Sequence, residues 1–318
     1  MDERTHRNAR NRAELPSERL QSLLVPIDLT PGSDRVLGRV ALLPLTKGAR
    51  VMLLHAVPES LPRGARRNAE RDAKSTLAEG ARTLTKALSR RVVVEPVVKI
   101  GSAASEIASL ATSMNAELVV MGRGHRRGLR DAFLGSTAER VIRRGQLPVL
   151  VVRLPARVAY QRPALALNLD AAAHEAVVQL LRIVPPPRPR LTIIHAYDIP
   201  YRGFTYPSLT EDDADDYRDH YRQKASQELE RLLATALARA NVPPQDAPRW
   251  KPLLRYGSPR STIEKFVEKA KPDLLVLGTH GYAGVAHTFL GTVAGDVLRA
   301  VTCDVLVVPP RQEASGTI

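Results

Sequence analysis

The same sequence pattern occurs twice in this chain. Residues 101–152 align with residues 257–308 at a constant offset of 156 positions, without a gap. The alignment places "PVLVV" on "DVLVV" and the loop "GRGHRRGLRDAFLGS" on "GTHGYAGVAHTFLGT". Self-similarity over such a length is typical of a duplicated structural unit. One domain present in two copies therefore explains the chain better than two unrelated domains.

The upstream parts of the two copies align with a different offset, of 140 positions. Asp28 then falls on Asn168, and His55 falls on His195. The second copy has 16 additional residues between its two blocks, and we place them around the acidic, Tyr-rich connection "YRGFTYPSLTEDDADDYRDHY". The predicted division of the chain is a charged tail, a first domain, a second domain and a C-terminal tail, at 1–20, 21–155, 160–310 and 311–318.

Short apolar runs alternate with helical stretches in each copy. In the first copy the runs are "SLLVPI", "RVMLLHAV", "VVVEPVV", "AELVVMG" and "PVLVV". They are rich in Val, Ile and Leu with little polar alternation, which is typical of strands covered on both faces. The helices are expected near 33–46, 64–90, 102–115 and 135–145. Ser102 and Ser136 stand at the expected N-cap positions. The alternation predicts two tandem α/β domains, each a doubly wound, five-stranded parallel sheet with helices on both faces.

Composition narrows the class of protein. The 44% hydrophobic content is enough for two cores, and no run approaches the roughly 18–20 apolar residues of a membrane-spanning helix. The charged N-terminal sequence lacks the apolar segment of a secretory signal, so we expect a cytoplasmic protein without a membrane partner. The single cysteine, Cys303, excludes a disulfide framework and favours a buried thiol.

Positive charge is concentrated in the first half. Residues 1–160 hold 28 Lys and Arg against 15 Asp and Glu, whereas residues 161–318 hold 19 against 18. A basic half attracts nucleic acid, nucleotides or anionic lipid, although charge runs usually face water. Aromatic residues make up only 4% of the chain, so bases would find few stacking platforms. Nucleic acid therefore ranks last among the partners we consider.

The topology predicts where a ligand would bind. Open parallel sheets bind ligands beyond the carboxyl ends of their strands, where the strand order reverses. In a sheet of order 3-2-1-4-5, this point lies between the first and fourth strands. Asp28 ends the first strand and Gly122 ends the fourth, and Asn168 and Gly278 take these places in the second copy. We expect each pair to face the other across a crevice.

The second-copy loop has the composition of a phosphate cradle. Gly278 and Gly281 let the backbone turn off the strand and bring N–H groups close to a ligand. Gly291 opens the next helix, whose first residues, Thr292 and Val293, offer a hydroxyl and free N–H groups at its positive end. The loop is neither a Walker A sequence nor a GxGxxG motif. The alternative is that the glycines only make tight turns and close packing.

The first-copy loop differs at one of these glycines. His125 stands where the second copy has Gly281. If the backbone there needs a positive φ, a residue other than glycine costs about 1–2 kcal/mol, and its side chain would occupy space beside the phosphates. Arg123, Arg126 and Arg127 instead place cations beside an anion site. Either this pocket is closed to ATP or it is a different anion site, and we favour impairment.

Both halves resemble the universal stress protein family, and the whole chain resembles its tandem, two-domain members. The motifs that carry the resemblance are "VPID", "LLHAV", "GSAASEI", "GSPRSTI", and the Gly-x2-Gly-x9-Gly-Ser/Thr loop with "AERV" after it. The resemblance implies the sheet order 3-2-1-4-5, binding of ATP or AMP with or without Mg²⁺, and a role in stress survival. It also implies pairing of the domains through their last strands, here "PVLVV" against "DVLVV", and leaves a homodimer open.

The nucleotide-binding residues that the resemblance implies can be carried over position by position. In the second domain they are Leu167, Asn168, Ala196, Gly257, Leu277, Gly278, Gly281, Gly291, Thr292 and Val293. In the first domain they are Pro26, Asp28, Gly101, Met121, Gly122, His125, Gly135, Ser136 and Thr137.

The residue after the first strand distinguishes the two predicted sites. Asn168 stands where the family has the Asp that holds the adenosine, and an amide in place of a carboxylate weakens binding about tenfold. A shifted register would make Asp170 the match instead. We nevertheless expect nucleotide mainly at the second site, because its glycine loop is intact.

No catalytic residue can be named from the sequence. His55 and His195 end equivalent strands, and we interpret both as packed histidines rather than catalysts. The sequence has no Cys/His cluster at metal-ligand spacing and no GxSxG elbow. The leading hypothesis is a nucleotide-binding regulatory protein of the stress response, with a slow ATP hydrolase on the same fold as the alternative. Binding of nucleic acid or an anionic partner through the basic half is the third hypothesis.

Overall fold

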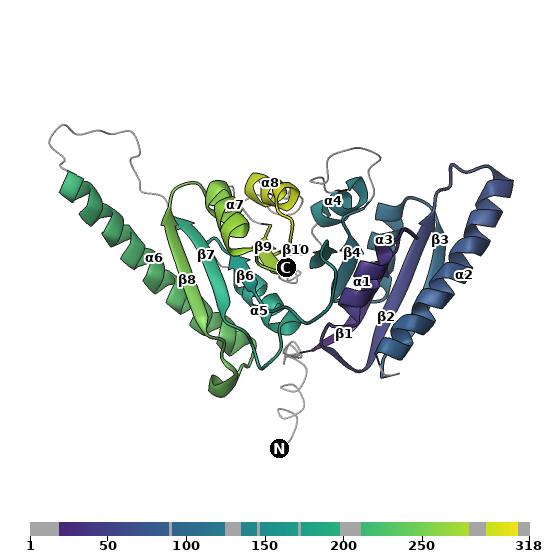
Figure 1. Cartoon of the computed structure of the whole chain (residues 1–318), viewed down its shortest axis with the longest axis horizontal. Coiled ribbons are helices and arrows are strands. Elements are labelled where there is room, and N and C mark those ends of the chain that lie inside the picture. The colour runs from purple at the N-terminus through teal and green to yellow at the C-terminus, as the bar shows by residue number, and fades with distance from the viewer. Residues whose placement is uncertain are drawn as a thin grey trace, which may run out of the picture.

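The computed structural model describes residues 19–88, 91–124, 135–144, 147–170, 173–197, 211–279 and 291–310. These residues form one ten-stranded sheet of order β3-β2-β1-β4-β5-β10-β9-β6-β7-β8, drawn as the continuous V-shaped layer of Figure 1. Every pair of neighbouring strands is parallel except β5 and β10, which are antiparallel. The sheet therefore consists of two five-stranded parallel halves, each in the predicted order 3-2-1-4-5, joined along their last strands.

The strands and α-helices of the two halves correspond one to one, and the second half has one additional 3-10 turn. The first half contains β1 (Leu20–Pro26), α1 (Ser33–Val40), β2 (Leu45–Val57), α2 (Arg63–Ala87), β3 (Val93–Ile100), α3 (Ala103–Ser113), β4 (Leu118–Gly122), α4 (Ser136–Arg143) and β5 (Val149–Val152). The second half contains β6 (Pro163–Ala166), α5 (Ala173–Ile183), β7 (Leu191–Tyr197), α6 (Glu211–Arg239), a 3-10 turn η1 (Pro244–Asp246), β8 (Trp250–Tyr256), α7 (Pro259–Ala270), β9 (Leu274–Gly278), α8 (Thr292–Ala300) and β10 (Asp304–Val308).

Helices cover both faces of the sheet, as the apolar strands require. One layer of apolar side chains packs α1, α2, α5 and α6 against one face, and a second layer packs α3, α4, α7 and α8 against the other. In Figure 1 the second group lies inside the V, with α2 and α6 along its outer arms. The central strands are buried almost completely; Leu118 and Leu274 are each 0% exposed. The predicted doubly wound α/β fold is confirmed.

Two local predictions about the first half need correction. The helix expected to run from 33 to 46 ends at Val40, because Pro44 cannot continue a helix and disfavours the helical conformation in the residue before it. Ser136 is the first residue of α4 rather than its N-cap, and the N-cap is Gly135. Ser102 does occupy the N-cap of α3, in extended conformation, although its side chain makes no cap hydrogen bond.

The acidic segment of the second half is largely helical. We expected a connection around residues 201–221, but α6 already begins at Glu211 and is 29 residues long, against 25 for α2. The first part of the expected connection, at 201–210, lies outside the described residues. Tyr217 and Tyr221, one turn apart on α6, contact each other edge to face with ring centroids 5.1 Å apart.

Each half fixes the start of its first strand in the same way. The carboxylate of Glu117, just before β4, accepts the backbone N–H of Gln21 at 2.6 Å. The carboxylate of Asp273, just before β9, accepts the backbone N–H of Gln161 at 2.6 Å. The two carboxylates thus tie the first and fourth strands of their sheets together at the amino end, opposite the predicted sites.

The junction of the halves combines an apolar strand pair with one buried carboxylate. β5 and β10 pair with Leu150 opposite Leu306, both 0% exposed. Asp304, at the start of β10, is also 0% exposed. Its carboxylate accepts hydrogen bonds from first-half and linker groups: Arg39 Nε at 3.1 Å, Tyr160 Oη at 2.8 Å, and the backbone N–H groups of Arg153 and Leu154 at 2.7 and 2.8 Å.

These contacts satisfy a charge that would otherwise be costly to bury. The Arg39 guanidinium also lies 4.0 Å from the centroid of the Tyr160 ring. Burial, followed by the nearby Asp304, raises the pKa of Tyr160 well above its ordinary value, so the phenol is a hydrogen-bond donor at neutral pH. Pro148 holds the place of Asp304 in the repeat, so this network exists only once.

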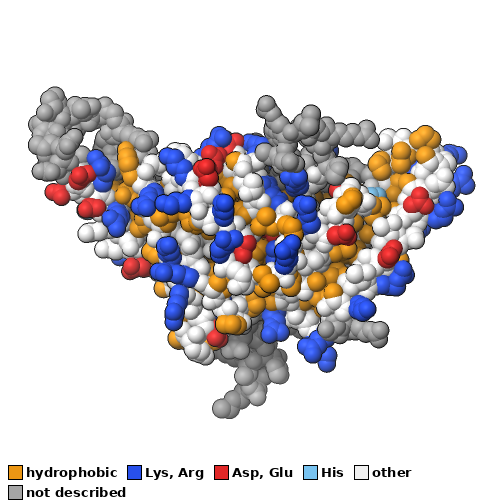
Figure 2. Space-filling view, viewed as in Figure 1, with side chains coloured by type: hydrophobic (Ala, Val, Ile, Leu, Met, Phe, Trp, Pro, Cys, Tyr) orange, Lys and Arg blue, Asp and Glu red, His pale blue; other side chains and the backbone are white. Residues whose placement is uncertain are grey.

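The surface gives no sign of a single basic stripe on the face drawn in Figure 2. Lys and Arg side chains on this face are scattered over both halves between apolar and neutral groups. Among the helices of the described residues, none combines the length and the apolar character that crossing a membrane would require.

Candidate functional site

A cavity lies at the switch point of each half. The first, of about 840 Å³, lies between the ends of β1 and β4 and is lined also by residues of α1, α3 and α4. The second, of about 240 Å³, lies between the ends of β6 and β9, beside α5, α7 and α8. Both positions agree with the rule for open parallel sheets. Ligand pockets usually measure about 300–1,000 Å³, so the first cavity falls inside this range and the second below it.

Most of the predicted site residues line these cavities. In the first cavity they are Pro26, Asp28, Met121, Gly122 and Thr137. In the second they are Leu167, Asn168, Ala196, Leu277, Gly278, Gly291, Thr292 and Val293. Gly101, Gly135, Ser136 and Gly257 are described but do not line either cavity. His125 and Gly281 lie outside the described residues. These are the equivalent positions that distinguish the two loops in the sequence.

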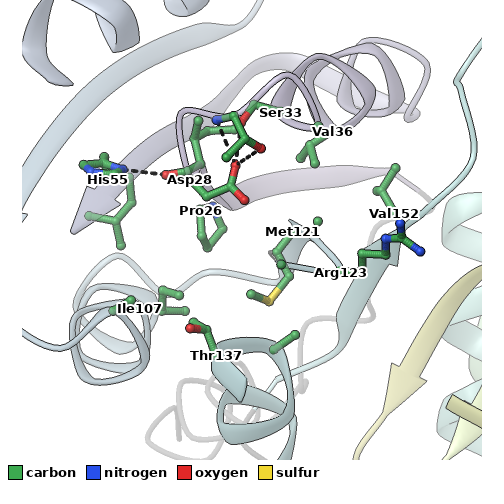
Figure 3. A pocket seen from close by; sticks show the side chains of 18 of the residues that line it. Pro26, Asp28, Ser33, Val36, His55, Ile107, Met121, Arg123, Thr137 and Val152 are labelled. Carbon is green, nitrogen blue, oxygen red and sulfur yellow. Dashed lines mark hydrogen bonds between the residues drawn. The ribbon is translucent and has the colours of Figure 1, made fainter. Parts of the chain in front are cut away.

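Asp28 also organises the turn between β1 and α1. Its Oδ1 accepts the Thr30 backbone N–H at 3.1 Å, the Thr30 hydroxyl at 2.7 Å and the Ser33 hydroxyl at 3.0 Å, as the dashed lines of Figure 3 show. The carboxylate is exposed and borders the cavity. It therefore combines a local structural role with access to a ligand, which the sequence alone did not indicate.

The two predicted histidines make the same contact in the two halves. His55 Nδ1 lies 2.8 Å from the carbonyl oxygen of Ile27, and His195 Nδ1 lies 3.0 Å from that of Leu167. Each histidine thus ties the end of the second strand to the residue that follows the first. Burial lowers the pKa of His195, partly offset by the bond to Leu167. These contacts support the interpretation of both side chains as packed histidines, and His55 also borders the first cavity.

The turn off β4 is made by a glycine that the sequence analysis did not single out. Gly124, one residue before His125, has φ +81°, a conformation that favours glycine. It packs against Gly135, where a Cβ atom would lie only 2.7 Å from the carbonyl oxygen of Arg123. Gly135 is therefore required by close backbone packing, and the first loop has its own turning glycine. The sequence "GRGH" does contain this turning glycine as its third residue, whereas the second glycine of "GTHG" is the fourth residue.

The helices after the two loops begin without side-chain caps. Gly135 and Gly291 are the N-caps of α4 and α8, and neither position has a side-chain cap hydrogen bond. The backbone N–H groups of the first helical turn are therefore not occupied by a cap side chain. Thr137 of α4 and Thr292 of α8 border the cavities next to these groups. A helix N-terminus in this position favours an anion.

Asn168 is held by its neighbour in the second cavity. Its Nδ2 donates to Asp170 Oδ2 at 3.0 Å, and Asp170 Oδ1 accepts the Ala173 N–H at the start of α5 at 3.1 Å. Asp170 also borders the cavity, so this half does place a carboxylate there, although two positions later than Asp28 in the first half. A Cβ atom on Gly278 would meet nothing within 4 Å. No described atom therefore stands in the way of a side chain at that residue.

Among the described residues, three arginines border the first cavity: Arg35, Arg123 and Arg153. Arg35 Nη1 donates to the carbonyl oxygen of Arg153 at 3.3 Å. The Arg153 guanidinium donates to the carbonyl oxygens of Leu298 and Val301 at the C-terminal end of α8. Burial lowers the pKa of Arg153, and the nearby Arg123 lowers it further, but an arginine stays charged in proteins. Arg123 could be placed at this site from the sequence, whereas Arg35 and Arg153 reach the cavity only through the fold.

Groups for metal or thiol chemistry are few. The described residues contain no cluster of three or more His, Cys, Asp or Glu side chains placed to hold a metal ion. Cys303 is buried, and burial raises the pKa of its thiol to about 12. A thiol with this pKa is a poor nucleophile at neutral pH.

The fold and these two cavities define a class: tandem, doubly wound α/β proteins with a cavity at each switch point. Residues 20–153 and 160–309 each match the sequence pattern of the Universal stress protein family. The chain belongs to this family, and it contains the family domain twice.

Several individual proteins are similar to the chain. A universal stress protein of Thermus aquaticus is 29% identical over 150 residues, which cover 46% of this chain and 88% of that protein. Universal stress protein MJ0577 of Methanocaldococcus jannaschii is 25% identical over 153 residues, covering 42% of this chain and 94% of its own. The crystal structure of a universal stress protein from Archaeoglobus fulgidus superposes with a TM-score of 0.64 at 18% identity, over 93% of this chain and 98% of its own. That superposition supports the two-domain fold.

Proposed function

We propose that this protein is a stress-response regulator that binds an adenine nucleotide, ATP or AMP, at its switch-point cavities. The observation that carries the proposal is the shape of the first site. A cavity of about 840 Å³ has the Asp28 carboxylate on one wall and the uncapped start of α4 on another. A carboxylate suits ribose or base donors, and a helix N-terminus suits phosphate.

The cavity volumes favour the first site as the principal one. The first cavity retains Asp28, and its loop turns off β4 at Gly124. The second cavity, of about 240 Å³, is smaller than most ligand pockets. This ranking differs from the sequence-based one, which weighed the glycine at position 281 most heavily. The intact second loop still supports a second, weaker site.

Two matched variants test the sites separately. Gly122 and Gly278 are equivalent residues at the ends of β4 and β9. A Cβ on Gly122 would lie 3.5 Å from Val36 Cγ2, an ordinary contact, and one on Gly278 would meet nothing within 4 Å. Gly122→Leu and Gly278→Leu should therefore fill one cavity each without a backbone clash. Circular dichroism and urea unfolding check that each variant is folded.

Calorimetric titration with ATP and AMP measures the nucleotide affinity of wild type, Gly122→Leu and Gly278→Leu. We expect wild type to bind nucleotide, Gly122→Leu to lose at least about tenfold in affinity for the tighter site, and Gly278→Leu to retain that site. A filled cavity removes nucleotide contacts, and about 1.4 kcal/mol corresponds to tenfold. No binding by wild type at millimolar nucleotide contradicts the proposed function. Binding that neither variant affects contradicts the assignment to these cavities.

A further inference from the structure

From the charged side chains that line the two cavities, we infer that the first cavity is selective for a nucleoside polyphosphate and the second for an adenine ligand with one phosphate or none. This inference rests on the proposed function and adds to it a rule for which ligand enters which cavity. The residues that set the rule in the first cavity are Arg35, Arg123 and Arg153.

The arginines and the carboxylate lie on different sides of the first cavity. Figure 3 shows Asp28 and His55 on one side and Arg123 beside Val152 on another, with Thr137 of α4 below. Arg35 is held near Arg153 by its bond to the backbone carbonyl of that residue. A nucleotide with its sugar toward Asp28 would therefore extend its phosphates toward the arginines and the start of α4.

Arg153 is fixed in place by the second half of the molecule. Its guanidinium donates to Leu298 and Val301 at the end of α8, and its Nε is buried without a hydrogen-bond partner among the described residues. A charge that is already held in position strengthens binding of a nearby anion, because little ordering is needed on binding. Each additional phosphate of the ligand would increase this contribution to affinity, whereas adenosine, which has no phosphate, would receive none.

The second cavity has no counterpart of these cations. The positions equivalent to Arg35, Arg123 and Arg153 are Glu175, Thr279 and Pro309. Among the described residues that line the second cavity, the single charged side chain is Asp170. The negative charge of this carboxylate repels a polyphosphate. The start of α8 can still offer its N–H groups to one phosphate, which limits this cavity to a ligand of low charge and small size.

The experiment uses the cavity-filled variants to measure each site alone. Gly278→Leu leaves the first cavity and Gly122→Leu leaves the second. Each protein is titrated with ATP, AMP, adenosine and inorganic tripolyphosphate. We expect the first cavity to bind ATP at least about tenfold more tightly than AMP and to bind tripolyphosphate in competition with ATP. We expect the second cavity to bind AMP or adenosine at least as tightly as ATP and to ignore tripolyphosphate.

A charge variant gives a second readout that does not depend on filling a cavity. The Arg35 side chain is exposed, so Arg35→Gln leaves the core intact. It should weaken ATP about tenfold and AMP less than about threefold, since a charge-assisted bond to phosphate is lost. Arg82→Gln, which removes the same charge from an exposed position on α2, is the matched control and should change neither affinity.

The outcomes separate the two proposals. The inference is overturned if both cavities show the same ratio of ATP to AMP affinity, or if Arg35→Gln weakens ATP and AMP equally. In those cases nucleotide binding itself, and hence the proposed function, stands. If wild type binds none of the four ligands, the proposed function and this inference fall together. Should the leucine variants not fold, the ratio of ATP to AMP loss in Arg35→Gln decides alone.

Discussion

The two halves share the contacts that hold the strands together and differ in the side chains that line the cavities. His55 and His195 bond to equivalent carbonyl oxygens, and Glu117 and Asp273 accept equivalent backbone N–H groups. These are interactions of a side chain with the main chain, so they depend on the fold and not on the ligand. Two copies of one fold therefore need them equally.

The side chains that line the cavities are not required by the fold in this way, so they can differ between the halves. Arg153 faces the first cavity, whereas Pro309 occupies the equivalent position in the second half. The charged residues at the junction are also unequal, because Asp304 has Pro148 as its counterpart. The asymmetry of the molecule is thus concentrated at the sites and at the junction. Predictions that compare equivalent positions in the two halves test whether this division is right.

The largest expected effect comes from the junction. Asp304→Leu leaves Arg39, Tyr160 and two backbone N–H groups without their acceptor in a buried place. Removing one partner of a buried ion pair costs about 3–5 kcal/mol, so the free energy of unfolding, measured in urea, should fall by that amount.

Asp273→Leu is the control for this variant, because Asp273 is only half-buried and also accepts two backbone N–H groups. Its loss should be about 1–2 kcal/mol. If the two variants lose the same stability, the junction carboxylate has no special role. In the double variant Arg39→Met with Asp304→Leu, part of the lost stability should return, since an apolar pair can replace a buried ion pair.

A smaller effect separates two kinds of glycine. Gly135→Ala would place a Cβ 2.7 Å from a backbone oxygen, whereas Gly278→Ala would place one in open space. We expect Gly135→Ala to lower the free energy of unfolding by about 2–3 kcal/mol and Gly278→Ala to change it by less than about 0.5 kcal/mol. Thermal and urea unfolding of both variants measure the difference. Equal losses would mean that the glycine at the end of β9 is also needed for packing.

The fold could be predicted because two independent features of the sequence indicate the same architecture. The repeat indicates two copies of one domain, and the apolar runs indicate the strands within each copy. Two gap-free blocks fixed the duplication, and strands rich in Val, Ile and Leu fixed a parallel sheet buried on both faces. The ends of two helices differ from the prediction: α1 ends at Val40, before Pro44, and the N-cap of α4 is Gly135 instead of Ser136. These differences arise from local steric constraints, which the periodicity of apolar residues in a helix does not reveal.

The positions of the two cavities follow from the topology, whereas the side chains that line them do not. Strand ends that meet at a switch point follow from topology, so Asp28 and Asn168 could be located from the sequence. Arg153 could not, because it reaches the first cavity from the residue just after β5, and its guanidinium is held by α8 of the other half. Contacts between residues 148 positions apart in the chain depend on how the halves are joined. Cavity volume is likewise a property of the assembled elements and cannot be inferred from a motif.

The smallest effect we predict concerns pH and the histidines. Burial lowers the pKa of His195 in the folded protein, so below the unfolded pKa of about 6.5 the unfolded chain binds a proton that the folded protein does not. Stability should therefore fall as the pH drops below about 6.5, by less than about 1.4 kcal/mol per pH unit, until the pH reaches the folded pKa. Urea unfolding of wild type and His195→Gln between pH 8 and pH 5 measures this: the variant should lose less stability than wild type on acidification.

His55→Gln, measured in parallel, shows how much of any change at fixed pH comes from losing the bond to a strand-end carbonyl. If His195→Gln and wild type have the same pH dependence, the buried histidine is not a source of acid sensitivity, and the contact it shares with His55 is purely structural.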